Sequence, residues 1–475
     1  MSDPATIQAR DIGGSGPGFE PLVADLRGLV VAPDAPDYDA ARAIWNGMID
    51  RRPAMILRCA ETADVIRAVR HAREQDLLVA VRGGGHNVAG TAACDGGMVI
   101  DLSTMKSIEI DRQARILRAD PGLLWGEVDA ATQACGLATP GGIVTHTGIA
   151  GLTLGGGLGW LMRKHGLTCD NLLACDVVTA EGKLLRASPE EHADLFWSLQ
   201  GGGGNFGIVT RLEYRLHPVG PEVLAGMVLY PAEQAGAVLR SYRDCVADAP
   251  EALTTVIILT KAPPAPFLPV QLHGRPVVIL MACYAGDLAE GEAALAPLRS
   301  LAEPLIDLIA PKPYVEHQAT LDPGVPHGLR YYWKSHYLPA LGDAAIDALV
   351  EHAWSAPSPQ SYTIMFHLGG AIRHRSPADS AFEDRSAEHA LNIDAVWSDP
   401  ATDAAQIAWV RRMFEATQPF ARGVYVNFLG QEGEERVRAA YGPEKYERLA
   451  RIKAKYDPDN FLRLNQNIKP HPGGC

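Results

Sequence analysis

Three glycine-rich segments in the first half of this 475-residue chain restrict its fold more than any other feature. They read RGGGHNVAG (82–90), TGIAGLTLGGGLGWL (147–161) and GGGGNFG (201–207). Glycine adopts positive φ freely and lets backbone N–H groups approach a ligand, and successive inward N–H groups form an anion-binding nest. Several such loops in one chain favour a long anionic ligand, and a diphosphate-linked dinucleotide is one.

The residues before the first glycine segment have the pattern of an α/β unit. PAMILRC (53–59) reads as a buried strand, residues 61–75 carry a helical apolar stripe, and LLVAV (77–81) reads as a second strand. His86 therefore follows the carboxyl end of a strand, where ligands of α/β sheets commonly bind. A nicotinamide Rossmann domain fits poorly, because the glycine segments lack the G-x-G-x-x-G spacing followed by an acidic residue about 20 positions on.

The second half of the chain differs in composition from the first. Beyond HPVGP (217–221), apolar strands alternate with Ala-rich helices predicted at 232–248, 288–302 and 342–354. This pattern favours an antiparallel sheet with helices on one face. Because the chain is also longer than one hydrophobic core usually serves, the sequence predicts an α+β protein of two domains.

Charge and composition exclude several classes of partner. The formal net charge of −13 argues against nucleic acid, and no run approaches the ~20 apolar residues of a membrane helix. The polar start lacks the apolar core of a secretion signal. The eight cysteines include no CxxC pair, so we expect reduced thiols and a cytoplasmic location. His146 has no partners at metal-ligand spacing, and we predict no metal.

His86 has two interpretations from the residues alone. A neutral imidazole nitrogen is a competent nucleophile, and the flanking glycines would let it approach the electrophilic methyl group of a flavin ring. A covalent bond would retain the cofactor and withdraw electron density from it. The alternative is a histidine that hydrogen-bonds only to its own loop.

Five segments, taken in order, decide between these interpretations. They are RGGGHN (82–87), the stretch at 139–182, DLFWSLQGGGGNFGIVT (194–210), YVNFL (425–429) and YDPDNFLRLNQNI (456–468). Together they resemble the bacterial berberine-bridge-enzyme-like oxidoreductases of the vanillyl-alcohol oxidase superfamily. The resemblance covers nearly the whole chain.

The resemblance implies a fold and a set of cofactor contacts. It implies a PCMH-type FAD-binding domain of two α/β subdomains at 1–216, a substrate domain at 217–422, and a segment at 423–475 that returns to the FAD-binding domain. The substrate domain would be a large antiparallel sheet covered by helices, and His86 would carry FAD covalently. The other residues implied to hold FAD are Arg82, Gly83, Gly84, Gly85, Asn87, Gly90, Thr147, Gly148, Gly151, Gly155, Gly156, Gly157, Gly159, Asp170, Asn171, Asn205, Gly207, Ile208, Val209, Asn427 and Asn465.

Two positions depart from or refine the family pattern. Many relatives form a second flavin bond through a cysteine whose place is held here by Val144, so we predict attachment through His86 only. That puts in doubt a bulky polysaccharide substrate. Three residues on, Thr147 holds the position that gates oxygen in relatives, and its small side chain favours an oxidase over a dehydrogenase.

Hydride removal needs a base near the ring, and three segments supply candidates. If YVNFL is a strand, Tyr425 and Asn427 share a face, and Tyr425 could assist deprotonation while Asn427 orients flavin or substrate. The alternative for Tyr425 is packing between domains.

Strand YYWKSHYL (331–338) places Tyr332 and Lys334 on one face, and a half-buried lysine beside aromatics can act as a base. Its alternative is a snorkelling surface lysine. His367, on the polar face of SYTIMFHLGG, would line a cavity or face solvent.

The predicted function follows from these residues together. We expect an FAD-linked oxidase that takes hydride from an alcohol or amine carbon of a small metabolite and reduces O2 to hydrogen peroxide. A dehydrogenase of the same fold with a non-oxygen acceptor is the alternative, and a flavin-carrying binding protein without turnover is a further one. The substrate and the oligomeric state have no readable signal in the sequence.

Overall fold

A four-stranded sheet begins the part of the chain that the structure, a computed structural model, describes, residues 26–472. The order is β1-β2-β4-β3, with β2, β3 and β4 parallel. Its elements are β1 (Leu29–Val31), α2 (Tyr38–Arg42), β2 (Met55–Arg58), α3 (Thr62–Glu74), β3 (Val79–Arg82) and β4 (Met98–Asp101). The predicted strand, helix and second strand are confirmed, and β3 ends directly before the first glycine segment.

A second, five-stranded antiparallel sheet follows, in the order β5-β6-β10-β8-β9. Its strands are β5 (Ile108–Asp111), β6 (Ile116–Ala119), β8 (Leu172–Val178), β9 (Leu184–Ala187) and β10 (Ile208–Arg215). A short pair joins β7 (Leu137–Ala138) to β11 (His217–Pro218), and the helices are α4 (Trp125–Gln133), α5 (Ile149–Leu154), α6 (Met162–His165) and α7 (Ala193–Leu199). The second glycine segment contains α5, and the third connects α7 to β10.

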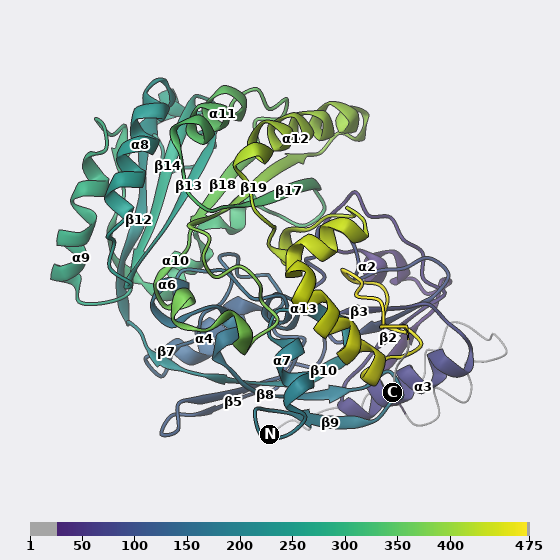
Figure 1. The fold of residues 1–475 in the computed structure, drawn as a ribbon. Coiled ribbons are helices and arrows are strands. Elements are labelled where there is room, and N and C mark those ends of the chain that lie inside the picture. The colour runs from purple at the N-terminus through teal and green to yellow at the C-terminus, as the bar shows by residue number, and fades with distance from the viewer. Residues whose placement is uncertain (1–25, 473–475) are drawn as a thin grey trace, which may run out of the picture.

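The middle of the chain forms a large antiparallel sheet of eight strands. Along it run β15 (Ile306–Asp307), β12 (Glu222–Pro231), β14 (Pro276–Tyr284), β13 (Leu253–Lys261), β18 (Tyr362–His367), β19 (His389–Trp397) and β17 (Arg330–Leu338), and β16 (Ala310–Pro313) pairs with β12. Helices α8 (Ala235–Val246), α9 (Leu288–Leu295), α11 (Asp343–Ala353) and α12 (Asp403–Thr417) lie on its outer side, whereas α10 (Tyr314–Gln318) lies by its other side (Figure 1). The predicted sheet with helices on one face is confirmed, and the α+β class with it.

The C-terminal helix α13 (Glu434–Tyr456) returns to the first half of the chain, as Figure 1 shows. Its apolar side joins the core of the five-stranded sheet. In the last turn of α13, the buried Lys453 donates from Nζ to Asp457 at 2.6 Å and to the backbone oxygen of Asn205 at 2.7 Å. This contact fastens the third glycine segment to the tail.

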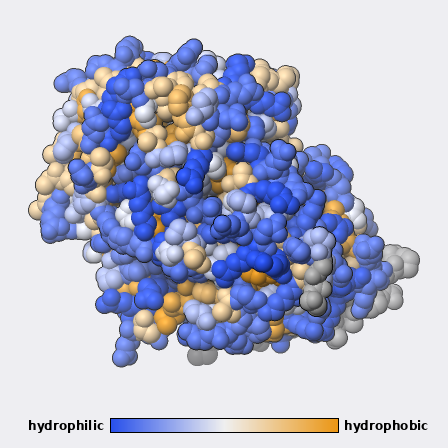
Figure 2. All heavy atoms as spheres, in the orientation of Figure 1, coloured by the Kyte–Doolittle hydropathy of each residue, from blue (hydrophilic) through white to orange (hydrophobic). Residues whose placement is uncertain are grey.

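The face drawn in Figure 2 is mostly hydrophilic, with apolar residues in small groups. Within residues 26–472 no helix combines the length and apolarity needed to cross a bilayer. The same residues hold no group of three or more His, Cys, Asp or Glu that could bind a metal ion. Inside the molecule, a cavity lined in part by polar side chains lies between the glycine segments and the large sheet.

Candidate active site

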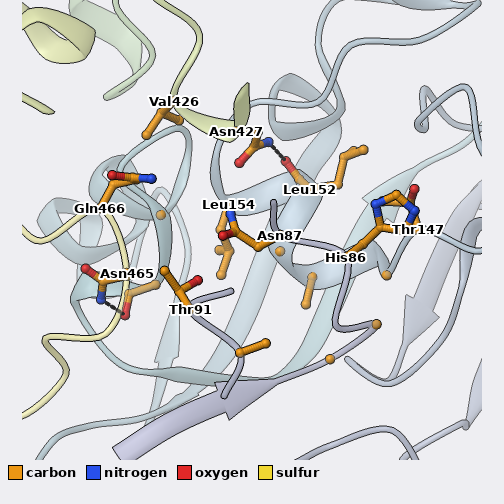
Figure 3. Close-up of a pocket in the computed structure, with 18 of the residues that line it drawn as sticks. His86, Asn87, Thr91, Thr147, Leu152, Leu154, Val426, Asn427, Asn465 and Gln466 are labelled. Carbon is orange, nitrogen blue, oxygen red and sulfur yellow. Dashed lines mark hydrogen bonds between the residues drawn. The ribbon is translucent and has the colours of Figure 1, made fainter. Parts of the chain in front are cut away.

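A cavity of about 320 Å³ lies between the glycine segments and the inner face of the eight-stranded sheet. Figure 3 shows His86 towards one end of it, Asn465 and Gln466 at the other, and Asn87 between them. Asn465 and Gln466 come from the C-terminal tail, so segments from both ends of the chain build the site. The lining residues extend from His86 to Asn465 and Gln466, and this arrangement suits a long ligand such as a dinucleotide.

The glycine loops form the first wall. A Cβ added to Gly84 would lie 2.6 Å from the Cα of Gly148, so only glycine lets these two loops touch. At Gly151 and Gly204 a Cβ would meet nothing within 4 Å, which leaves bare backbone beside open space for a bound group. The predicted cofactor residues that line the cavity are Gly83, Gly84, Gly85, His86, Asn87, Thr147, Gly148, Gly151, Asn205, Gly207, Ile208, Val209, Asn427 and Asn465.

Four other predicted cofactor residues lie outside the cavity and have structural contacts. Arg82 donates to the buried Asp101 at 2.7 Å, because the side chains of adjacent strand ends meet there. Asp170 pairs with Arg385 at 2.7 Å. Asn171 donates from Nδ2 to the Leu167 carbonyl at 2.9 Å, and Gly90, at φ +72°, turns against Ile49.

The glycines after α5 are also behind the cavity wall. Gly155 packs on the Asn427 side chain, and the N–H of Gly157 donates to the Tyr425 hydroxyl at 2.7 Å. Gly156, at φ +128°, lies against Phe382, and Gly159 packs on the backbone of residue 141. Gly155 and Gly157 support the Asn427 and Tyr425 side chains, which line the cavity, but none of the four glycines lines it, contrary to the prediction.

His86 is half-buried on the cavity wall and is held on two sides. The Trp45 ring stacks on the imidazole with centroids 4.2 Å apart and planes 16° apart. Its Nε2 lies 3.1 Å from Nδ1 of His146. Burial lowers the pKa of His86 to about 3, and the neighbouring His146 and His327 add to the effect. The imidazole is therefore neutral at physiological pH.

Tyr425 and Asn427 both reach the cavity, but not from a strand. Residues 426–428 form one turn of 3-10 helix, so the predicted strand is wrong. The amide of Asn427 donates to the Leu152 carbonyl at 2.9 Å, as Figure 3 shows, and to the Tyr425 hydroxyl at 2.7 Å. With Gly157, two donors thus meet the Tyr425 oxygen, and burial raises the pKa of this phenol. The hydroxyl keeps its own proton for donation.

The sheet forms the second wall, and its side chains are mostly aromatic. On three adjacent strands, Trp333 and Tyr362 flank Asp394 on either side. Phe366 and Phe428 extend the wall, with ring centroids 5.8 Å apart. None of these residues is a candidate from the sequence, because aromatic residues in apolar segments read as core.

One polar pair interrupts this apolar wall. Asn392 donates from Nδ2 to Oδ1 of Asp394 at 2.7 Å, and both residues are almost fully buried. Asp394 Oδ2 and Asn392 Oδ1 have no hydrogen-bond partner within residues 26–472. Burial raises the pKa of Asp394 well above its usual value. Unsatisfied buried oxygens cost free energy, so the pair indicates a place where a bound molecule supplies the missing bonds.

Three predicted catalytic residues do not line the cavity, because they point to the opposite face of the sheet. Lys334 pairs with Glu432 at 2.7 Å, and its Nζ lies 4.4 Å from the centre of the Phe414 ring. The Tyr332 hydroxyl accepts from Arg411, and His367 lies beside Arg163 at a separate surface pocket. Alternation along β17 and β18 was predicted correctly, but the cavity lies on the aromatic face and the predicted face meets the helices.

Two family models match segments of the chain that contribute residues to this site. The family model of the FAD binding domain matches residues 53–188, and the model described as berberine and berberine like matches residues 424–469. An FAD-linked oxidoreductase of Dictyostelium discoideum is 30% identical over 94% of this chain and 95% of its own. The chain belongs to the berberine-bridge-enzyme-like family. It is an FAD-dependent oxidoreductase of the PCMH-type fold.

Other members of the berberine-bridge-enzyme-like family add detail. The (R)-6-hydroxynicotine oxidase of Paenarthrobacter nicotinovorans is 32% identical, over 94% of this chain and 97% of its own. The solved structure of 6-hydroxy-D-nicotine oxidase from Arthrobacter nicotinovorans superposes with a TM-score of 0.84 at 29% identity, covering 94% of this chain and 98% of that one. BBE-like 1 of Physcomitrella patens, at 23% identity, 96% and 99% coverage and a TM-score of 0.85, shows the fold.

Proposed function

We propose that this flavoenzyme is an oxidase that carries FAD on His86 alone. It removes hydride from an alcohol or amine carbon of a small metabolite and reduces O2 to hydrogen peroxide. The observation that carries the proposal is the position of the His86 imidazole, which lies on the cavity wall, stacked on Trp45 and with Nε2 3.1 Å from Nδ1 of His146, while burial lowers its pKa. Neutral imidazole is the nucleophilic form. Val144, which lines the cavity, has no nucleophilic atom for a second bond.

The second wall supplies the substrate contacts in this proposal. When bound, FAD accepts the hydride. Asp394, flanked by Trp333 and Tyr362, takes the proton from the substrate O–H or N–H, since burial raises its pKa and so makes its carboxylate a stronger base than an exposed one. Tyr425 stays protonated and donates a hydrogen bond. The aromatic side chains exclude water and favour a small, largely apolar substrate with one polar group.

Oxygen as the acceptor rests on Thr147 and on the relatives. Thr147 lines the cavity, and its small side chain leaves space for O2. The two relatives named as 6-hydroxynicotine oxidases, at 32% and 29% identity, are oxidases by name. A dehydrogenase would share the fold and cofactor but would reoxidise slowly in air. Stopped-flow mixing of the reduced enzyme with aerated buffer separates the two, and slow reoxidation contradicts the oxidase.

Acid precipitation tests the attachment. We expect the wild-type pellet to be yellow and the His86→Ala pellet to be colourless, with its flavin in the supernatant. A colourless wild-type pellet would refute covalent attachment. Peroxide release, screened over secondary alcohols, phenols, sugars and cyclic amines, then identifies the substrate class.

A further inference from the structure

Three histidines from separate loops run from the cavity wall to the surface. His86 follows β3, His146 precedes α5 and His327 precedes β17. The His86 and His146 rings have centroids 5.0 Å apart, and the His146 and His327 rings are also 5.0 Å apart. His86 borders the cavity and His327 is exposed. The row therefore joins the flavin side of the molecule to solvent.

Covalent attachment leaves His86 with a proton to lose. Within residues 26–472, Nδ1 of His86 has no side-chain partner, whereas Nε2 contacts Nδ1 of His146 at 3.1 Å. When the Nδ1 lone pair forms a bond to carbon, the ring becomes a cation unless the Nε2 proton leaves. No carboxylate within the described residues hydrogen-bonds to His86, so His146 is the base in contact with it.

We propose that His146 accepts the Nε2 proton of His86 while His86 Nδ1 bonds the flavin, and that His327 releases this proton to solvent. The proposal rests on the proposed covalent attachment. In the step, a C–N bond forms between Nδ1 and the 8α-methyl carbon, and one methyl C–H bond breaks. The two electrons of that bond reduce the flavin ring, which O2 reoxidises. O2 takes up the two electrons with two protons from solvent to form H2O2, and these two protons balance the methyl proton and the imidazole proton that the step releases.

The surroundings of His146 suit a proton acceptor. Trp45 already holds the His86 ring, because its Nε1 is anchored to the Val325 carbonyl at 2.9 Å, so His146 is not needed as a clamp. The Nε2 of His146 is buried without a partner within residues 26–472. Burial and His327 lower the pKa of His146, which keeps it neutral, and the nearby Asp322 acts in the opposite direction.

Asp322 is fixed where it stabilises a protonated His146. Its carboxylate accepts from the backbone N–H of Thr145 at 2.9 Å and from the Thr145 hydroxyl. A fixed negative charge beside an imidazole favours its charged form. The titratable groups that face His146 are thus His86, His327 and Asp322. Transfer from His86 towards His327 follows the direction of increasing exposure.

The test measures the rate of flavin attachment. Each protein, purified with its flavin still partly unattached, is incubated with excess FAD in aerated buffer between pH 6 and 9. Samples are acid-precipitated and protein-bound flavin is counted per chain. His146→Gln keeps a hydrogen-bond acceptor but cannot take a proton. We expect attachment about tenfold slower or more in His146→Gln and His146→Ala, with slowing greatest at low pH. Added imidazole should accelerate His146→Ala.

The controls separate this inference from the proposed function. His374→Ala removes an exposed histidine that pairs with Glu251 and has no contact with the three histidines, and it should match wild type. His327→Ala should slow attachment less than His146→Gln. Noncovalent FAD absorbance reports folding of each variant. Wild-type attachment rates in His146→Gln, or no effect of imidazole on His146→Ala, would overturn the role of His146. Covalent flavin remaining in His86→Ala would instead overturn the proposed attachment.

Discussion

The two walls of the cavity differ in the groups that they present to a ligand. The glycine wall offers backbone, and its loops touch because Gly84 and Gly148 have no side chains. The sheet wall offers side chains, with Trp333 and Tyr362 on either side of Asp394. Bare backbone gives close approach and N–H groups but no base, and in the proposed mechanism the base for the substrate is Asp394 on the sheet.

This difference predicts how each wall responds to substitution. A side chain added on the glycine wall changes the shape of the loops, and it destabilises the protein through steric overlap. A change on the sheet wall alters chemistry or contact area and leaves the fold in place, because the strands are held by backbone hydrogen bonds and by helices on the far side. Substitutions on the glycine wall should therefore change stability and FAD content, whereas substitutions on the sheet wall should change turnover.

Asp394→Asn should have the largest effect. Losing a positioned base lowers kcat about 10²- to 10⁴-fold while the flavin content stays near wild type. Steady-state peroxide release with the identified substrate measures it. Asp129→Asn is the matched control, since Asp129 is another buried aspartate with a raised pKa, outside the cavity. Equal losses in both variants would assign the effect to burial rather than to the site.

The pH dependence of kcat/KM in the wild-type enzyme should also come from the Asp394 carboxyl. Because burial raises the pKa of Asp394, the carboxyl keeps its proton into a range where an exposed aspartate is ionised, so kcat/KM should rise with pH as that proton is lost. In Asp394→Asn this rise should vanish. Stability has the opposite sign: a raised folded-state pKa makes the free energy of unfolding fall as pH rises above about 3.9. The variant should lose that slope, as urea unfolding at several pH values can show.

On the glycine wall, Gly84→Ala should act through the fold. Its Cβ would overlap the backbone of Gly148, which cannot rotate away, and we expect about 3 kcal/mol of lost stability and poor FAD retention. Denaturant unfolding and flavin content measure both. Gly342→Ala, where a Cβ meets nothing within 4 Å, is the control and should change little. A stable Gly84→Ala protein with full flavin would mean that the loops are further apart.

The same contrast explains what sequence could predict. The glycine wall was largely predictable, because close backbone approach requires glycine and β3 places His86 at a strand end. The sheet wall was not, since alternation shows which residues share a face but not which face meets the cavity. Lys334 has the chemistry of a base, but it faces helix α12 and not the cavity. Asp394 lies in a strand of buried residues, and its only signal is Asn392 two residues earlier.

Trp333→Leu should weaken substrate binding without stopping turnover. Trp333 lines the cavity beside Asp394, and its ring meets Phe428 edge-on with centroids 5.9 Å apart. Removing part of this aromatic area should raise KM about tenfold, equivalent to about 1.4 kcal/mol, with a smaller change in kcat. Steady-state kinetics would show it. An unchanged KM would place the substrate elsewhere along the wall.

Lys334→Met, one residue further along the same strand, should have the smallest effect. Lys334 faces the helices, and its partner Glu432 keeps Arg436 at 3.3 Å when the lysine is gone. Methionine retains the apolar contact with Phe414, so the loss of stability should be about 1 kcal/mol, and kcat and KM should stay within about twofold of wild type. Because Trp333 and Lys334 are adjacent in β17, their contrast tests which face of the sheet meets substrate. A greater than tenfold loss of kcat in Lys334→Met with full flavin content would reverse that assignment.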